Sequence, residues 1–116
     1  MDDITYGKKC EIIATNYLKN KGYKKIKNNY KNKIGEIDII AKDNNTIVFV
    51  EVKGRFTRAL GDPFEAINYT KQQKIRNVAT FYLKVNGLLN APCRFDAIAV
   101  LGDSDAEIRH IVDAFS

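Results

Sequence analysis

The segment from Thr46 to Val52 constrains the fold of this chain more than any other part of the sequence. It reads Thr-Ile-Val-Phe-Val-Glu-Val, and β-branched and aromatic residues in such a run predict a strand. Successive side chains of a strand point to opposite faces, so valines 48, 50 and 52 would cover one face while residues 47 and 49 cover the other. A strand that is apolar on both faces lies in the centre of a sheet covered on both sides. With 116 residues, the chain fits one domain over positions 1–116.

The rest of the sequence predicts the neighbours of this strand. Apolar spacing predicts a helix over 4–19, and a strand follows over 23–30 with Tyr23 and Ile26 as its apolar anchors. Residues 36–41 form a hairpin with 46–52 across an Asp-Asn-Asn turn. Asp62-Pro63 begins a short helical turn that breaks before a main helix ending near 86–87, with a box at Thr70 as a start signal. Strands over 94–101 and 108–115 complete an α/β fold, a mixed β-sheet of four or five strands flanked by helices.

The charge distribution indicates a polyanionic partner. The formal net charge is +5, and residues 1–35 hold nine lysines against three acidic residues. Such an arm can follow phosphates without reading sequence, and Lys24, Lys25 and Lys27 are its candidate contacts. A solvated lysine-rich surface explains the same composition, and charge alone does not separate the two interpretations.

Several other functional classes find no support in the sequence. Cys10 and Cys93 lie far apart without a CxxC partner, which argues against a zinc site or a redox motif. No apolar run is long enough to cross a bilayer, and the acidic start at residues 1–3 differs from a secretory signal. We therefore expect a cytoplasmic protein with reduced thiols and no membrane partner. His110 has no evident partner and is interpreted as structural.

The candidate chemistry lies on the hairpin. If its loop has two or four residues, opposed positions sum to 89, so Asp38 faces Glu51 on one side of the sheet and Lys53 follows two residues on. An odd loop would break this alignment. Two opposed carboxylates repel each other, and a divalent cation with oxygen ligands, Mg²⁺ or Mn²⁺, would compensate. The plainer alternative is an exposed Glu51–Lys53 pair beside a solvated Asp38, and it fits poorly with a strand that is covered on both faces.

Three further residues each allow two interpretations. Lys71 lies on the apolar stripe of the main helix, where it could meet a phosphate or pack its stem and extend its ammonium to solvent. Glu11 lies at the margin of the first helix's apolar face, as a third carboxylate of the site or as an ordinary surface glutamate. Asp96 could approach the site or pair with Arg94.

The residues around the acids resemble a known family. Gly35-Glu36-Ile37-Asp38 followed by Phe49-Val50-Glu51-Val52-Lys53-Gly54-Arg55 resembles the PD-(D/E)XK nuclease superfamily. The wider set resembles the YraN-like family of small bacterial proteins, which is similar to archaeal Holliday-junction resolvases; the set comprises Gly7, Glu11, Ala14, Leu18, Gly61, Pro63, Lys71 and the run Arg94-Phe95-Asp96. Cys10 departs from the pattern, because glycine is expected before this glutamate, and the departure bears on how closely the helix packs around Glu11.

The resemblance implies a restriction-endonuclease-like fold with Asp38 and Glu51 as metal ligands and Lys53 as the catalytic lysine. It adds Glu11 and Lys71 to the catalytic set, and Arg55 to the nucleic-acid contacts. We therefore expect a Mg²⁺- or Mn²⁺-dependent endonuclease acting on DNA rather than RNA, on branched or damaged substrates, with a homodimer as one option for its assembly. The alternatives are a nucleic-acid-binding module that keeps the fold without turnover, and an interaction protein with a basic arm.

Overall fold

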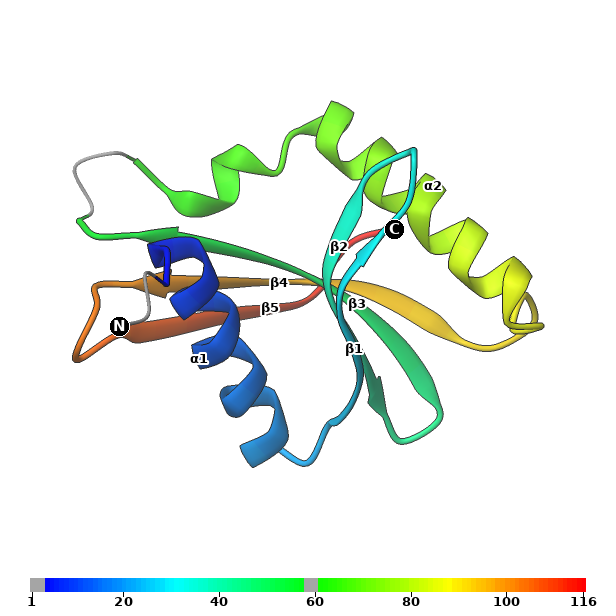
Figure 1. Cartoon of the computed structure of the whole chain (residues 1–116), viewed down its shortest axis with the longest axis horizontal. Helices are drawn as coiled ribbons and strands as arrows, with labels where there is room; N and C mark the ends of the chain where they lie inside the picture. The colour runs from blue at the N-terminus through cyan, green and yellow to red at the C-terminus, as the bar shows by residue number, and fades with distance from the viewer. Residues whose placement is uncertain (1–3, 58–60) are drawn as a thin grey trace.

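Two helices and five strands make up most of the chain, and the computed structural model describes residues 4–57 and 61–116. In chain order, the elements are α1 (Tyr6–Asn20), β1 (Lys24–Lys31), β2 (Glu36–Asp43), β3 (Thr46–Arg55), the 3₁₀ turn η2 (Pro63–Ala66), α2 (Tyr69–Val85), β4 (Cys93–Leu101) and β5 (Glu107–Phe115). The expected α/β class, with a mixed sheet flanked by helices, is confirmed (Figure 1).

The sheet has the strand order β1-β2-β3-β4-β5, so each strand pairs with its neighbours along the chain. Every pairing is antiparallel except that of β3 with β4, which is parallel. Parallel neighbours need a long crossover, and η2 and α2 lie in this connection. The segment that begins at Thr46 is therefore the central strand, as its two apolar faces predict, and it extends to Arg55.

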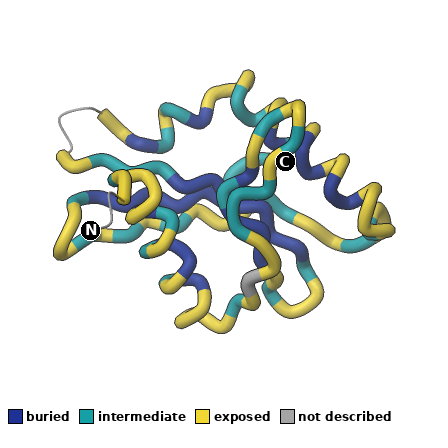
Figure 2. Tube along the Cα trace, viewed as in Figure 1, coloured by how far each residue is buried: buried dark blue, intermediate teal, exposed yellow. Residues whose placement is uncertain are grey.

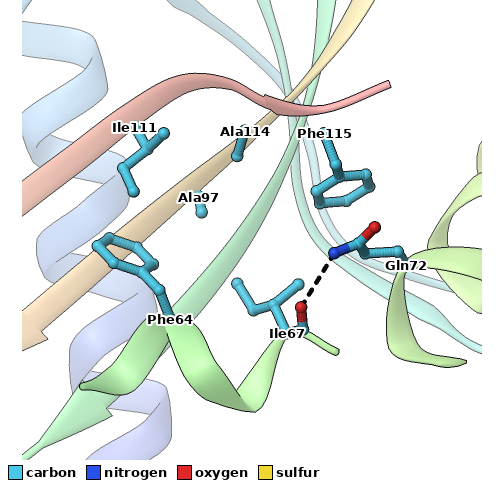
Figure 3. Close-up of a pocket in the computed structure, with 7 residues that line it drawn as sticks. All are labelled: Phe64, Ile67, Gln72, Ala97, Ile111, Ala114 and Phe115. Atoms are coloured by element: carbon cyan, nitrogen blue, oxygen red, sulfur yellow. Dashed lines mark hydrogen bonds between the residues drawn. The ribbon is translucent and has the colours of Figure 1, made fainter. Parts of the chain in front are cut away.

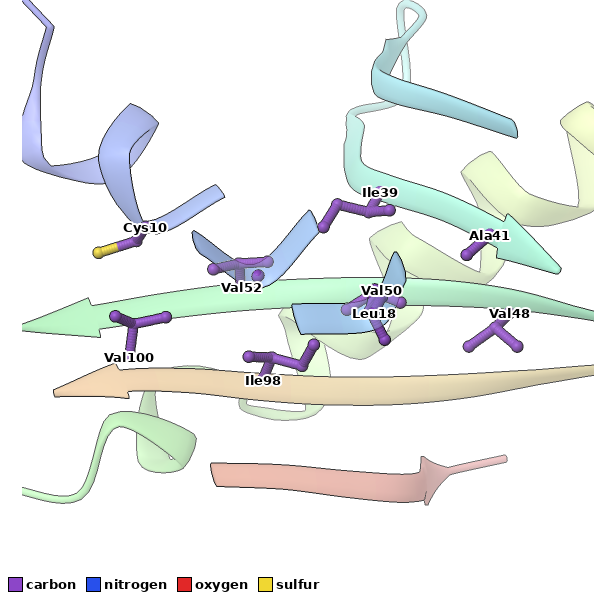
Figure 4. Close-up of a cluster of buried hydrophobic side chains, with 10 residues drawn as sticks. Cys10, Leu18, Ile39, Ala41, Val48, Val50, Val52, Ile98 and Val100 are labelled. Carbon is purple, nitrogen blue, oxygen red and sulfur yellow. The ribbon is translucent and has the colours of Figure 1, made fainter. Parts of the chain in front are cut away.

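Each face of the sheet is covered by one helix, and each helix forms its own hydrophobic cluster with the strands. Cys10, Ala14 and Leu18 of α1 pack on Val48, Val50 and their neighbours (Figure 4). On the opposite face, α2 packs on a cluster that includes Phe49. Both clusters draw on β3, and the buried part of the chain runs through the middle of the sheet (Figure 2). Side chains of β3 that are polar are consequently held between layers rather than in open solvent.

The helix starts follow the capping residues that the sequence supplies. The Asp62 side chain accepts a hydrogen bond from the Phe64 backbone N–H at 3.0 Å at the start of η2, so the expected short turn before the main helix is confirmed. The main helix begins earlier than the Thr70 signal suggested, because Asn68 caps it and accepts from the backbone N–H of Lys71 at 2.9 Å. Lys71 thus lies in the first turn of α2.

The first strand differs from expectation at one of its anchors. The apolar pattern predicts a buried Ile26, but the pairing of β1 with β2 shifts between Lys25 and Lys27, and Ile26 is 41% exposed. A bulge inserts one extra residue on one strand and turns it out of the alternation, which removes Ile26 from the core. Within the described ranges, no helix combines the length and apolar character needed to cross a membrane.

Candidate active site

The hairpin of β2 and β3 has the register that the turn length predicts. Its ladder runs from Asp43 opposite Thr46 to Ile39 opposite Val50, and the two residue numbers of each pair sum to 89. One further step along both strands brings Asp38 beside Glu51. At this point the carboxylate of Asp38 takes the place of a ladder partner, because its Oδ2 accepts a hydrogen bond from the Val52 backbone N–H at 2.8 Å. The two strands are therefore joined at Asp38 by a side chain.

The strict alternation expected for β2 is wrong at Asp38. Ile37 belongs to the cluster on the α2 face, whereas Ile39, two residues on, belongs to the cluster on the α1 face. Residues two apart on a regular strand share a face, so the backbone turns between these isoleucines. The Asp38 side chain reaches the backbone of β3 instead of standing off the face with Glu51. This slip cannot be read from a pattern of alternating residues.

Glu51 is the most enclosed acid of the site, with a side chain only 3% exposed. The ammonium of Lys71 lies 3.2 Å from its Oε2, and that of Lys53 lies 3.7 Å from the same oxygen. Lys71 therefore points at the acids from the first turn of α2 instead of only extending to solvent. A charged group inside a protein is costly unless it is paired, and two lysines supply partners for this carboxylate.

Asp38 differs electrostatically from Glu51. Burial raises the pKa of Asp38 to about 8, and the charge of Glu51 is the next largest cause. The hydrogen bond from Val52 acts in the opposite direction and is outweighed. Near neutral pH the pair therefore holds a proton that a cation would displace.

Glu11 approaches this centre from α1. Its charge is among the causes that raise the pKa of Asp38, and its side chain is 16% exposed. Glu11 Oε1 accepts hydrogen bonds from Asn29 Nδ2 at 2.8 Å and from Lys8 Nζ at 3.4 Å. The structure thus brings Glu11 toward the acids, through contacts with a strand residue that sequence patterns did not single out.

The carboxylates of this site suit Mg²⁺ better than an ion that takes all of its ligands from the protein. Across residues 4–57 and 61–116, no group of three or more histidine, cysteine, aspartate or glutamate side chains forms an ion cage. Mg²⁺ characteristically uses one or two protein carboxylates and takes its other oxygens from water and substrate phosphates. Asp38, which is half-buried, and Glu51, which is buried, are adjacent and raise each other's electrostatic energy, so they match that requirement.

A glycine on β3 lets α1 approach this part of the sheet. A Cβ built on Gly54 would lie 2.3 Å from Cys10 Sγ and 2.8 Å from Tyr6. The family pattern led us to expect the small residue on the helix, before Glu11. Here Cys10 is 1% exposed, and the strand supplies the glycine, so close packing is preserved.

The nucleic-acid candidates divide into two groups. Arg55 lies at the end of β3, four residues beyond Glu51; its Nε is buried without a hydrogen-bond partner among the described residues, and its Nη1 donates to the Gly54 carbonyl. Lys24 pairs with Lys42, four residues along β2 from Asp38, which corresponds to about 13 Å at the rise of a strand. Lys27 is exposed on β1, and the side chain of Lys25 lies outside the described residues. Lys24 therefore lies apart from the acids, whereas Lys27 pairs with Ile40, two residues along β2 from Asp38. Arg55 extends the strand that carries Glu51.

A second polar network lies on the α1 side of the sheet, and the sequence interpretation raised only its Arg94–Asp96 pair. Asp96 is fully buried and accepts hydrogen bonds from Arg94 Nε at 3.0 Å and from the Asp113 backbone N–H at 3.0 Å. His110 Nε2 lies 2.8 Å from Asp96, and its Nδ1 lies 3.2 Å from the hydroxyl of Tyr17. The partner that His110 lacked in the sequence is thus Asp96, and the pairing of Asp96 with Arg94 is confirmed. Hydrogen bonds to its charged form lower the pKa of Asp96 although burial opposes them.

An apolar pocket of about 140 Å³ lies between η2, α2, β4 and β5 (Figure 3). Its lining consists of Phe64, Ile67, Gln72, Ala97, Ile111, Ala114 and Phe115. The lining contains none of the acids or lysines described above, and Gln72 donates to the carbonyl of Ile67 within it. Ala97 pairs with Glu51 in the register of β3 and β4, so the pocket adjoins the candidate site without containing its charged groups.

Comparisons with known proteins match nearly the whole chain to one family. The model of a family described as "Uncharacterised protein family UPF0102" matches residues 10–100. A UPF0102 protein of Thermodesulfovibrio yellowstonii is 45% identical over 115 residues, covering 99% of both chains. A UPF0102 protein of Clostridioides difficile is 48% identical over 105 residues, covering 90% of this chain and 91% of the relative. One from Alkaliphilus oremlandii is 50% identical over 108 residues, covering 90% and 92%.

Proposed function

The chain belongs to the UPF0102 family, the YraN-like proteins, and we propose that it is a Mg²⁺- or Mn²⁺-dependent endonuclease that hydrolyses phosphodiester bonds in DNA. The observation that carries this proposal is the adjacent pair of the half-buried Asp38 and the buried Glu51, with two lysine ammonium groups on one oxygen of Glu51. Membership of the PD-(D/E)XK nuclease superfamily is part of the same proposal. It rests on the Glu51-Val52-Lys53 run and the aspartate that meets it across the hairpin.

Asp38 and Glu51 are the residues that would hold the metal ion. When bound, Mg²⁺ would neutralise charge developing on the phosphate and acidify a water molecule. Asp38 would have to give up its proton to serve as a metal ligand, since ligands coordinate in their deprotonated form. Lys53 and Lys71 compensate the charge of Glu51 in the free protein.

The two lysines supply fixed positive charge to the substrate. Lys53 is 26% exposed and lies 3.7 Å from Glu51, so its ammonium would be within reach of a phosphate bound beside the acids. Lys71 is 38% exposed and lies in the first turn of α2, where the helix dipole also favours an anion. A preorganised cation beside developing negative charge lowers the barrier more than it strengthens ground-state binding. Arg55 lies two residues beyond Lys53, and its Nε has no hydrogen-bond partner within residues 4–57 and 61–116, so its guanidinium is suited to an adjacent phosphate.

A pure binding function does not account for the arrangement as well. Adjacent carboxylates that are partly shielded from solvent destabilise a fold and repel a phosphate backbone unless a cation lies between them. A module that only bound nucleic acid would gain from having lysine or a neutral residue in place of Asp38. The acids are therefore better explained by a reaction than by affinity.

The test is single-turnover cleavage of labelled duplex, flap and four-way-junction DNA with Mn²⁺, and a chelator as blank. We expect the wild type to cut at least one substrate, and Lys53→Ala to cut it about 10²–10³ times more slowly while binding DNA nearly as well. Lys84→Ala is the matched control, because Lys84 lies in the last turn of α2, away from the acids. Lys53→Arg should restore only part of the rate, because a planar guanidinium does not replace a compact ammonium.

Two results would overturn the proposal. The wild type could fail to cut any DNA in the panel although it is folded and metal is present. Alternatively, Lys53→Ala and Lys84→Ala could cut at the same rate. Either result would favour a nucleic-acid-binding module that keeps these residues without turnover.

A further inference from the structure

Asn29 has an unusual backbone conformation for its place in the fold. It lies inside β1 with a φ of 51°, in the left-handed region. Two other described residues that are not glycine share this conformation, Asn44 and Asp113, and Asn44 lies in the hairpin turn, where such a φ is common. Asn29 lies within a paired strand, where a left-handed residue is strained. Strain of this kind persists when the surroundings impose it, and it is concentrated at functional sites.

The neighbours of Asn29 place it opposite the candidate metal ligand. Asn28 pairs with Ile39 and Tyr30 pairs with Ile37, so Asn29 comes level with Asp38 on the adjacent strand. This is the same position at which the alternation of β2 slips between its two faces. The left-handed residue of β1 and the change of face in β2 therefore both occur at the level of Asp38.

The side chain of Asn29 joins three charged residues. Its Nδ2 donates to Glu11 Oε1 at 2.8 Å and to Glu36 Oε2 at 3.1 Å. Its Oδ1 accepts from Lys8 Nζ at 2.8 Å. The amide thus separates two carboxylates that would otherwise repel, and it fixes the orientation of Glu11, which acts on Asp38 through its charge.

We propose that Asn29 is a positioning residue that holds the Glu11 carboxylate toward the Asp38–Glu51 metal centre. The inference rests on the proposed function, because it assigns Asn29 a role at the same site. In this role Asn29 would act through Glu11 and would not itself be a metal ligand. Groups that orient residues around a metal centre in this way typically change metal affinity or activity by about 10–100-fold when removed.

The variant that tests this role is Asn29→Gly. Glycine accepts the left-handed backbone without strain, so removing the amide should leave the melting temperature within a few degrees of wild type. Asn44→Gly is the matched control, because it relieves the same conformation in the hairpin turn, beyond the far end of the β2–β3 ladder from Asp38. We expect Mn²⁺ affinity, measured by calorimetry without nucleic acid, to fall about tenfold in Asn29→Gly and to be unchanged in Asn44→Gly.

A double-mutant cycle with Glu11→Gln separates positioning from a purely structural role. If Asn29 acts through Glu11, Asn29→Gly should lower Mn²⁺ affinity about tenfold in the wild type and have almost no further effect in Glu11→Gln. An equal effect in both backgrounds, or equal affinities for the Asn29 and Asn44 variants and wild type, would overturn this inference alone. A wild type that binds no Mn²⁺ would instead contradict the proposed function, and this role of Asn29 with it.

Discussion

The raised pKa of Asp38 makes the stability of the metal-free protein depend on pH in a direction opposite to that of an ordinary paired carboxylate. Its pKa is about 8 in the folded state against a reference of 3.8. Between these values the folded protein holds a proton that the unfolded chain has lost. The contribution of this proton to the free energy of unfolding is fully present below pH 4 and is lost as the pH rises toward 8.

The size of the effect follows from the shift. One pKa unit corresponds to about 1.4 kcal/mol, so the whole interval gives an upper limit of roughly 5–6 kcal/mol in the free energy of unfolding. Sharing of the proton with Glu51 and partial access of solvent reduce it, and we expect about 2–4 kcal/mol. Asp38→Asn cannot ionise, and its amide oxygen can still accept from Val52. The variant should therefore match wild type near pH 4 and exceed it by that amount at pH 9.

The assay is urea unfolding of both proteins from pH 4 to pH 9 with a chelator present. Asp103→Asn is the control, because Asp103 is an exposed carboxylate whose Oδ2 lies 4.0 Å from Lys9 Nζ, and its curve should run parallel to that of wild type. The reasoning would be refuted if Asp38→Asn also ran parallel to wild type, or if it were the less stable protein at pH 9.

Three further predictions concern packing, the buried network and the basic arm. Gly54→Ala should lower the free energy of unfolding by about 1–3 kcal/mol because its new methyl group would collide with Cys10, and Cys10→Ala should recover part of that stability in urea unfolding. Asp96→Ala should cost about 3–5 kcal/mol at pH 7, because it leaves Arg94 without its buried partner, and an unchanged urea midpoint would contradict the network. Charge reversal at Lys24 and Lys27 should reduce the slope of log K against log salt, measured by fluorescence anisotropy, by up to about 0.9 for each phosphate that these side chains no longer neutralise, and an unchanged slope would place DNA on another surface.

The parts of the fold that local chemistry determines could be predicted from the sequence. The register of β2 and β3 follows from the number of turn residues, and the break before α2 follows from Asp62 and Pro63. The central place of β3 follows from its two apolar faces. In each case the deciding residues are adjacent in the chain, so periodicity and turn chemistry were sufficient.

The features that the sequence did not predict depend on contacts between segments far apart in the chain. The left-handed Asn29 and the exposed Ile26 reflect how β1 joins β2 under α1. The partnership of Asp96 with His110 requires the register of β4 with β5 and the docking of α1. At Asp38, the alternation rule gave the correct neighbour and the wrong orientation, because the side chain replaces a backbone partner.

The central claim is that Asp38 and Glu51 bind a divalent metal ion. The most direct test is a calorimetric titration of the metal-free wild type with Mn²⁺ at pH 7 and at pH 8. We expect Mn²⁺ to bind at one site. Its affinity should be higher at pH 8 than at pH 7, because Asp38 is protonated in a smaller fraction of the molecules at the higher pH. Asp38→Asn and Glu51→Gln should abolish the heat of binding, whereas Glu65→Gln, an exposed acid of η2, should bind like wild type. A wild type that binds no ion at millimolar concentration, or carboxylate variants that bind as tightly as Glu65→Gln, would contradict the account.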